Sequence, residues 1–159
     1  MIFSPIEKVL EDLRAGKPVL VTDDESRENE GDAIIAGELA TPEWVAWMIR
    51  YTTGYLCAPM TEQRANELDL PVMWHANEDP HQTNYTVSVD AANRESTGIS
   101  AKERSLTANV LADPGSTPKS LIRPGHVLPL RAKPGGVLER AGHTEAAVDL
   151  LRLAGLQQV

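Results

Sequence analysis

An acidic run over residues 23–32 is the first part of the sequence whose side chains could do chemistry. It holds six carboxylates and one arginine, and Glu28, Glu30 and Asp32 alternate along it. In an extended segment alternate side chains share one face, so we expect these three carboxylates to converge. Converging carboxylates repel one another unless a cation or a proton lies among them. Because Mg²⁺ takes oxygen ligands, the run predicts a metal site, with a solvated acidic loop as the alternative.

A second candidate site is the segment Arg140-Ala141-Gly142-His143-Thr144, which directly precedes a helical pattern. We expect Thr144 to cap that helix, leaving backbone N–H groups at the positive end of the helix dipole, where phosphate binds. Arg140 adds a positive charge, Gly142 lets the backbone come close to a ligand, and His143 offers a metal ligand or a proton carrier. The alternative is an ordinary capped helix with an incidental histidine.

Two further segments carry polar side chains beside turns. His126 follows a Pro-Gly turn at residues 124–125 and is a candidate acid or base, although a surface histidine is the commoner outcome. Thr97 lies in the segment 96–100, whose hydroxyls and helix start could hold another phosphate oxygen. Plain capping of that helix by Ser100 explains the same residues equally well.

The composition excludes several classes of partner. The chain of 159 residues has a net charge of -8, which argues against nucleic acid, and its apolar runs are too short to cross a bilayer. The single Cys57 rules out an internal disulfide framework and favours the reducing cytoplasm; we interpret it as a buried, inert thiol. His75 and His81 lack zinc-site spacing, so we interpret them as loop residues, with His81 near the pocket.

The elements that must position these residues mix helices and strands without strict alternation. Counting their capping residues, we predict helices over 4–16, 41–54, 62–68, 100–113 and 144–155, and strands over 18–22, 33–37, 55–58, 83–90 and 126–131. No Gly-x-Gly-x-x-Gly element follows a strand, which argues against a dinucleotide-binding fold. The pattern is typical of one α+β domain over residues 1–159, with a mixed β-sheet covered by helices.

Taken together, five segments resemble the 3,4-dihydroxy-2-butanone 4-phosphate synthase family. In chain order they are residues 23–32, 85–90, 97–100, 123–126 and 142–150. The resemblance covers essentially the whole chain. Ser26 stands where the family usually has Asp, and Leu128 where it often has Phe, and neither departure touches the chemistry.

The resemblance implies a metal-dependent lyase of riboflavin biosynthesis that converts D-ribulose 5-phosphate into 3,4-dihydroxy-2-butanone 4-phosphate and formate. It implies that Glu28 and His143 hold Mg²⁺ or Mn²⁺, and that no organic cofactor is needed. The implied substrate contacts are Arg27, Glu28, Asp32, Thr97, Arg140, Ala141, Gly142, His143 and Thr144, and the implied catalytic groups are His126, Glu30 and Asp32. Family members are homodimers with sites near the subunit interface.

The resemblance also implies a family segment beyond the helix that ends at Gly155, with a second essential glutamate that would fall past Val159. Gln158 stands where a Pro is usual. We therefore keep four interpretations: a shortened synthase, a short paralogue with a partial or different enediolate reaction, a non-catalytic sugar-phosphate-binding partner subunit, and a metal-dependent isomerase or aldolase-like enzyme. We also expect a partner subunit to cover the sheet edge left by the missing strand.

Overall fold

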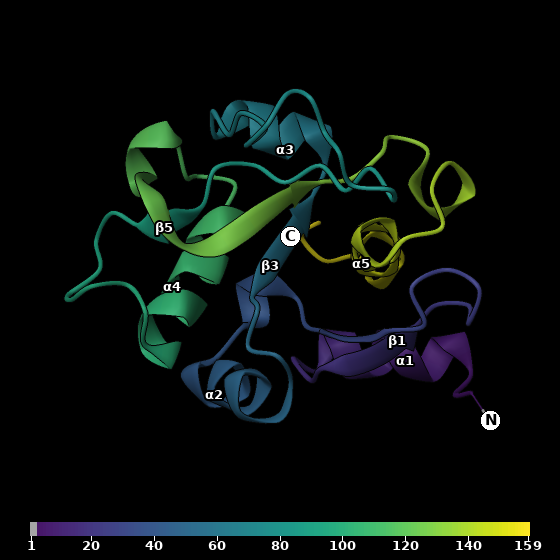
Figure 1. Cartoon of the computed structure of the whole chain (residues 1–159). Coiled ribbons are helices and arrows are strands. Elements are labelled where there is room, and N and C mark those ends of the chain that lie inside the picture. Colours follow the sequence, from purple (N-terminus) through teal and green to yellow (C-terminus); the bar gives the residue numbers. More distant parts are fainter. Residues whose placement is uncertain (1–2) are drawn as a thin grey trace.

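A three-stranded mixed sheet runs through the middle of the molecule (Figure 1). In the computed structural model, which describes residues 3–159, the long strand β5 (Leu121–Arg131) lies between β3 (Cys57–Met60) and β4 (Val89–Ala91). β3 pairs with β5 in parallel, and β4 pairs with it antiparallel. The predicted α+β class with a mixed sheet is therefore confirmed.

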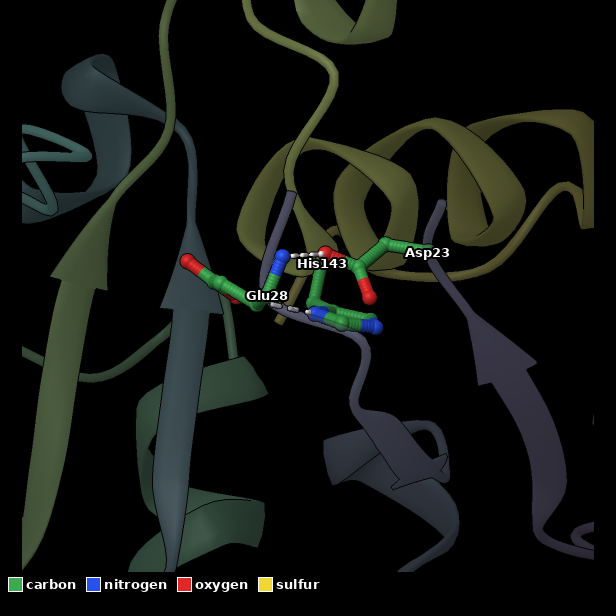
Figure 2. Close-up of side chains that lie close together, drawn as sticks. All are labelled: Asp23, Glu28 and His143. Atoms are coloured by element: carbon green, nitrogen blue, oxygen red, sulfur yellow. Dashed lines mark hydrogen bonds and ion pairs between the residues drawn. The ribbon is translucent and has the colours of Figure 1, made fainter. Parts of the chain in front are cut away.

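A separate hairpin carries the acidic run. β1 (Val19–Thr22) and β2 (Gly31–Ile34) pair antiparallel, with Thr22 opposite Gly31. Residues 23–30 of the run thus form the hairpin loop, and Gly31 and Asp32 begin β2. Figure 2 shows the loop residues Asp23 and Glu28 beside His143, the first residue of helix α5 (His143–Ala154). The predicted strand over 33–37 was placed too late, because the chain leaves the ladder after Ile34 and forms a short 3-10 turn over Gly37–Leu39.

All five predicted helices are present. Besides α5 they are α1 (Ile6–Arg14), α2 (Pro42–Tyr51), α3 (Glu62–Glu67) and α4 (Ala101–Ala112). Thr41 and Ser100 cap α2 and α4 as predicted, each accepting a hydrogen bond from a backbone N–H in the first turn.

Two predicted caps are wrong. The N-cap of α1 is Pro5 rather than Ser4, and it makes no side-chain cap hydrogen bond. The N-cap of α5 is Gly142 rather than Thr144, because the Gly142 carbonyl already accepts the helical N–H of Ala146 at 2.9 Å. Thr144 consequently lies inside the first turn, where it is buried.

The pairing of β4 with β5 differs from the predicted strands over 83–90 and 126–131. The register shifts between Val89, which lies opposite Val127, and Asp90, which lies opposite Ile122. Residues 123–126 of β5 therefore bulge out of the ladder, so β5 begins earlier than its sequence pattern indicated. The predicted strand before β4 is reduced to isolated bridges, one of which joins Tyr85 to Leu130.

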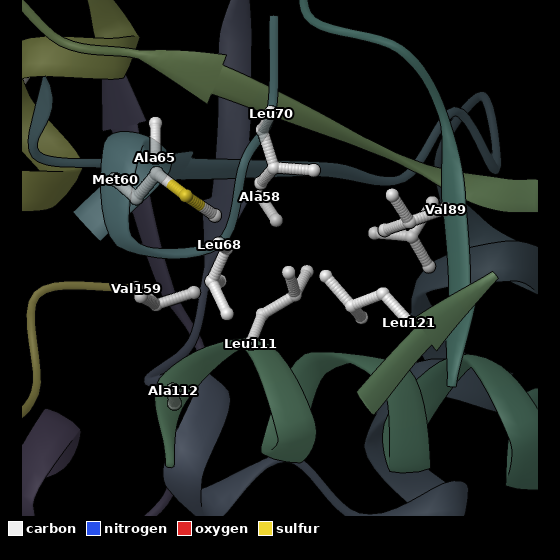
Figure 3. Packing of buried hydrophobic residues seen from close by; sticks show 11 residues of the cluster. Ala58, Met60, Ala65, Leu68, Leu70, Val89, Leu111, Ala112, Leu121 and Val159 are labelled. Carbon is white, nitrogen blue, oxygen red and sulfur yellow. The ribbon is translucent and has the colours of Figure 1, made fainter. Parts of the chain in front are cut away.

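Two apolar clusters hold these elements together. Figure 3 shows the larger one, which draws on the sheet, α3, α4 and the segments after α3 and α5. Its residues are Ala58, Met60, Ala65, Leu68, Leu70, Val89, Leu111, Ala112, Leu121, Val127 and Val159. The smaller one joins α1, the hairpin and α5 through Leu13, Val19, Ile34, Ala147 and Ala154. This second cluster fixes α5 against the hairpin. Among the residues described, none of the helices is both long and apolar enough to cross a membrane.

Candidate metal and substrate site

The hairpin loop and the start of α5 bring Asp23, Glu28 and His143 together (Figure 2). One ligand atom from each residue lies within 4.8 Å of the other two. The loop folds around the Asp23 carboxylate, which accepts the backbone N–H groups of Glu28 at 3.0 Å and Glu30 at 2.9 Å. Asn29 between them takes a positive φ of 55°, a conformation that asparagine tolerates, and this turns the chain back toward Asp23.

A single arginine balances the charge of this cluster. Arg27 places one guanidinium nitrogen 3.0 Å from the Asp23 carboxylate and 2.9 Å from the Glu28 carboxylate. Burial raises the pKa of Asp23, but the N–H groups of Glu30 and Glu28 and the Arg27 side chain outweigh it and lower that pKa to about 2. Asp23 is therefore ionised at neutral pH and remains an acceptor for a cation.

His143 closes the cluster from the helix side. Its Nδ1 lies 3.5 Å from a Glu28 oxygen and 3.9 Å from an Asp32 oxygen, and its side chain is only 9% exposed. Its Nε2 is buried, and no group in the described part of the chain hydrogen-bonds to it. Two carboxylates and an imidazole with unused ligand capacity form a donor set that fits Mg²⁺ or Mn²⁺.

Glu28, Glu30 and Asp32 do not share one extended face as predicted, although all three line the same cleft and both Glu28 and Asp32 approach His143 Nδ1. The segment is a turn with Asn29 in the left-handed region, so side-chain alternation does not hold across it. Instead Asp23, which the prediction did not single out, joins Glu28. Glu30 and Asp32 are exposed and line the neighbouring cleft.

A cleft of about 1190 Å³ opens beside the cluster. Its polar lining includes residues that the sequence predicted: Arg27, Glu28, Glu30, Asp32, Arg140, His143 and Thr144. The lining also carries apolar and aromatic side chains, among them Trp47, Tyr51 and Tyr55. His126 and Thr97 are not among the residues that line the cleft. The described part of a single chain therefore does not bring all of the predicted site residues to one site.

Arg140 is held by the protein itself. Its three donor nitrogens bind the carbonyl of His81 at 2.8 Å, the carboxylate of Glu145 at 2.6 Å and the hydroxyl of Thr83 at 2.8 Å. Glu145 is almost completely buried and also accepts the N–H of Lys133 at 2.9 Å. Arg140 thus ties the loop around residue 81 to the start of α5, and its contact with substrate remains a prediction.

This tie brings His81 to the cleft. His81 lines the cleft, and its Nδ1 lies 4.0 Å from a Glu28 oxygen. The sequence placed His81 in a loop near the pocket, and the structure confirms that position. The contact of its carbonyl with Arg140, 59 residues further along the chain, is one for which the spacing of residues gives no signal.

A second polar cluster lies on the central sheet. The carboxylate of Asp90 accepts the backbone N–H of His126 at 2.9 Å and lies 2.9 Å from the Nδ1 atom of its ring. Gly98 packs directly against this carboxylate, which places the neighbouring Thr97 close to the same cluster. Cys57 lines the cleft and is partly buried, rather than fully buried as predicted. Burial and then the nearby charge of Asp32 raise the pKa of its thiol to about 12, which keeps the thiol protonated.

The predicted phosphate contact at residues 96–100 gains no support. The N–H groups of Ser96 and Gly98 already bind the Glu103 carboxylate, at 2.5 Å and 2.9 Å. Ser100 accepts the N–H of Glu103 at 3.2 Å, which is ordinary capping. A carboxylate in this position repels a phosphate. The contacts therefore favour the structural explanation of this segment.

Comparison with known proteins identifies the family of this site. A sequence model of the 3,4-dihydroxy-2-butanone 4-phosphate synthase family matches residues 7–159. The chain belongs to that family. The riboflavin biosynthesis protein RibBA of Salinispora arenicola (strain CNS-205) is 60% identical over 155 residues, which are 98% of this chain and 37% of that protein. RibBA of Nocardia farcinica (strain IFM 10152) is 59% identical, with 98% and 37% covered.

Solved structures of the family show the same fold. A 3,4-dihydroxy-2-butanone 4-phosphate synthase in complex with two magnesium ions superposes with a TM-score of 0.96 at 51% identity, covering 98% of this chain and 73% of that one. The synthase of Candida albicans gives a TM-score of 0.90 at 52% identity, covering 99% and 78%. The chain thus spans most of these structures but about 37% of the length of its RibBA relatives.

Proposed function

We propose that the chain converts D-ribulose 5-phosphate into 3,4-dihydroxy-2-butanone 4-phosphate and formate, as a lyase of riboflavin biosynthesis. The observation that carries the proposal is the cluster of Asp23, Glu28 and His143 at the edge of a polar cleft in a member of this family. These three residues would hold Mg²⁺ or Mn²⁺. When bound, the ion supplies Lewis-acid stabilisation of negative charge on adjacent sugar oxygens.

The chain's own residues supply binding and proton transfer. The first turn of α5 presents backbone N–H groups at its positive end, where the stretch 140–144 would hold an anionic substrate oxygen. Arg27 adds a positive charge to the lining of the same cleft. Glu30 and Asp32 are exposed carboxylates that line the same cleft, and we propose that they move protons between neighbouring carbons of the sugar. His126 is proposed as a further acid or base.

The position of His126 supports a homodimer. Along β5 the neighbour of His126, Val127, lines the cleft, whereas His126 does not. In a homodimer, the His126 of one copy would complete the site of the other copy, because within its own chain His126 does not face the cleft. Exposed apolar side chains at the cleft, Leu20 at 75% and Tyr51 at 65%, fit such a contact. Sedimentation that shows only a monomer would count against this arrangement. A cytoplasmic location also remains a prediction.

The test is ¹³C NMR of the protein with ¹³C-labelled ribulose 5-phosphate and Mg²⁺. Labelled formate together with a four-carbon ketone phosphate is the expected result. Turnover without formate would overturn the synthase reaction in favour of another enediolate reaction on the same sugar. Binding of substrate and metal without turnover would favour a binding subunit instead.

A further inference from the structure

Asp90 is buried, and no step of the proposed reaction uses it. The residue is 2% exposed in β4, and its two carboxylate oxygens face His126 as a pair. Oδ1 accepts the backbone N–H of His126 at 2.9 Å, while Oδ2 lies 2.9 Å from the ring nitrogen Nδ1. The backbone contact fixes which oxygen faces the ring, so the carboxylate cannot rotate without losing a hydrogen bond.

The surroundings pack closely against this carboxylate. Any Cβ at Gly98 would overlap the Asp90 carboxylate, and Gly98 itself has a φ of +98°, which strains other residues. A Cβ at Gly125 would overlap the backbone of Val89 and Asp90. The Arg94 guanidinium lies 3.9 Å from Asp90 Oδ2 and adds a positive charge on that side. Two glycines and a cation thus hold Asp90 against His126.

We propose that Asp90 is a positioning residue that holds His126 in the tautomer with the proton on Nδ1 and a free lone pair on Nε2. A carboxylate only accepts hydrogen bonds, so the ring nitrogen facing it must be the donor. Nε2 is then free to take a proton from substrate, and Asp90 stabilises the charged ring that results. This inference rests on the proposed function only for the statement that His126 acts on substrate.

The substitution Asp90→Asn tests the tautomer directly. The backbone N–H of His126 requires an acceptor, so the amide oxygen takes the place of Oδ1 and the NH₂ group faces Nδ1. A donor at that position makes Nδ1 the acceptor and moves the ring proton to Nε2. We expect ¹⁵N NMR of the His126 ring to show Nδ1 protonated in the unsubstituted protein and Nε2 protonated in the variant.

Kinetics test the consequence. We expect kcat of Asp90→Asn to fall by about 10²–10⁴-fold with KM little changed. The His126 ring stays in position, but its Nε2 carries the proton and can no longer accept one from substrate. Asp113→Asn removes an exposed carboxylate at the end of α4 and serves as the matched control, with unchanged kinetics. Asp90 acts through His126, so Asp90→Asn added to His126→Ala should slow the enzyme no further.

Three outcomes would overturn the inference. An unchanged tautomer in Asp90→Asn removes the positioning role. Additive losses in the double variant show that Asp90 acts only on the fold. Full activity of His126→Ala removes the histidine from the reaction. If the unsubstituted protein releases no formate, the proposed function fails on its own, and the ¹⁵N spectra still decide whether Asp90 sets the tautomer.

Discussion

The two polar clusters of this molecule are built in opposite ways. Asp23, Glu28 and His143 come from a hairpin loop and a helix start that are far apart in the chain. Asp90 and His126 lie on neighbouring strands of one sheet, joined by two contacts of 2.9 Å. The first cluster depends on the packing of α5 against the hairpin, whereas the second forms where the bulge of β5 brings the His126 N–H and ring to the Asp90 carboxylate.

The two clusters also differ in how their charges are balanced. In the first cluster two carboxylates and an imidazole share one arginine, and the His143 Nε2 finds no partner within residues 3–159. Such a cluster is completed by a cation. In the second cluster one carboxylate meets a backbone donor and a ring donor, which satisfies it without a ligand. We infer that the first cluster responds to metal and the second does not.

The largest effect should come from removing a carboxylate of the first cluster. We expect Glu28→Gln to lower the rate of formate release by about 10³-fold or more, since Lewis-acid stabilisation contributes several kcal/mol. Calorimetry with Mn²⁺ should show correspondingly weaker binding. Glu25→Gln removes an exposed carboxylate of the same loop and is the matched control. Equal metal affinity of both variants would remove Glu28 from the metal site.

The next largest effect concerns the ion pair between Arg140 and Glu145 at the start of α5. Arg140→Ala leaves the buried Glu145 without its partner, and breaking such a pair costs about 3–5 kcal/mol in the free energy of unfolding. Arg152→Ala removes an arginine whose side chain is 62% exposed and pairs with Asp149, where the cost is about 0–1 kcal/mol. Urea denaturation measures both. Similar losses would show that α5 does not depend on the buried pair.

Local signals predicted most of the fold. Thr41 and Ser100 are capping residues followed by helical patterns, and both caps are present. Errors arose where tertiary contacts override the local pattern. The bulge in β5 depends on pairing with Asp90, and the start of α5 depends on Gly142 rather than on the better capping residue two positions later. Neither can be read from one segment alone.

The site was predicted by residue type more accurately than by geometry. Glu28 and His143 meet as the resemblance implied, although strand alternation, the geometric argument for the acidic run, was wrong. Asp23 was overlooked because its role rests on backbone N–H groups that only a folded loop supplies. His126 and Glu28 lie in two different clusters because of how the sheet is arranged in space. The spacing of residues along the sequence does not reveal that arrangement.

Acid should weaken the loop of the first cluster through Asp23. Its pKa is lowered from the ordinary value of 3.8 to about 2 on folding, so its ionised form stabilises the folded state. That contribution is complete above about pH 5 and is lost as the pH falls through about 4 toward 2. We expect the stability gap between the unsubstituted protein and Asp23→Asn to shrink over this range. Denaturation in EDTA excludes a contribution from metal, and a gap that is independent of pH would contradict the assignment.

The smallest effect probes the charge of Asp32, which lines the cleft together with Cys57. Burial and then the charge of Asp32 raise the pKa of Cys57 to about 12, so at pH 8 only about 10⁻⁴ of the thiol is ionised. Because the thiolate is the reactive form, iodoacetamide should modify native Cys57 far more slowly than the urea-unfolded chain. Asp32→Asn should raise the native rate by a few-fold only, since burial is the larger cause. Equal rates in Asp32→Asn and the unsubstituted protein would show that the charge of Asp32 does not influence the thiol, whereas a much larger increase would make Asp32 rather than burial the dominant influence on it.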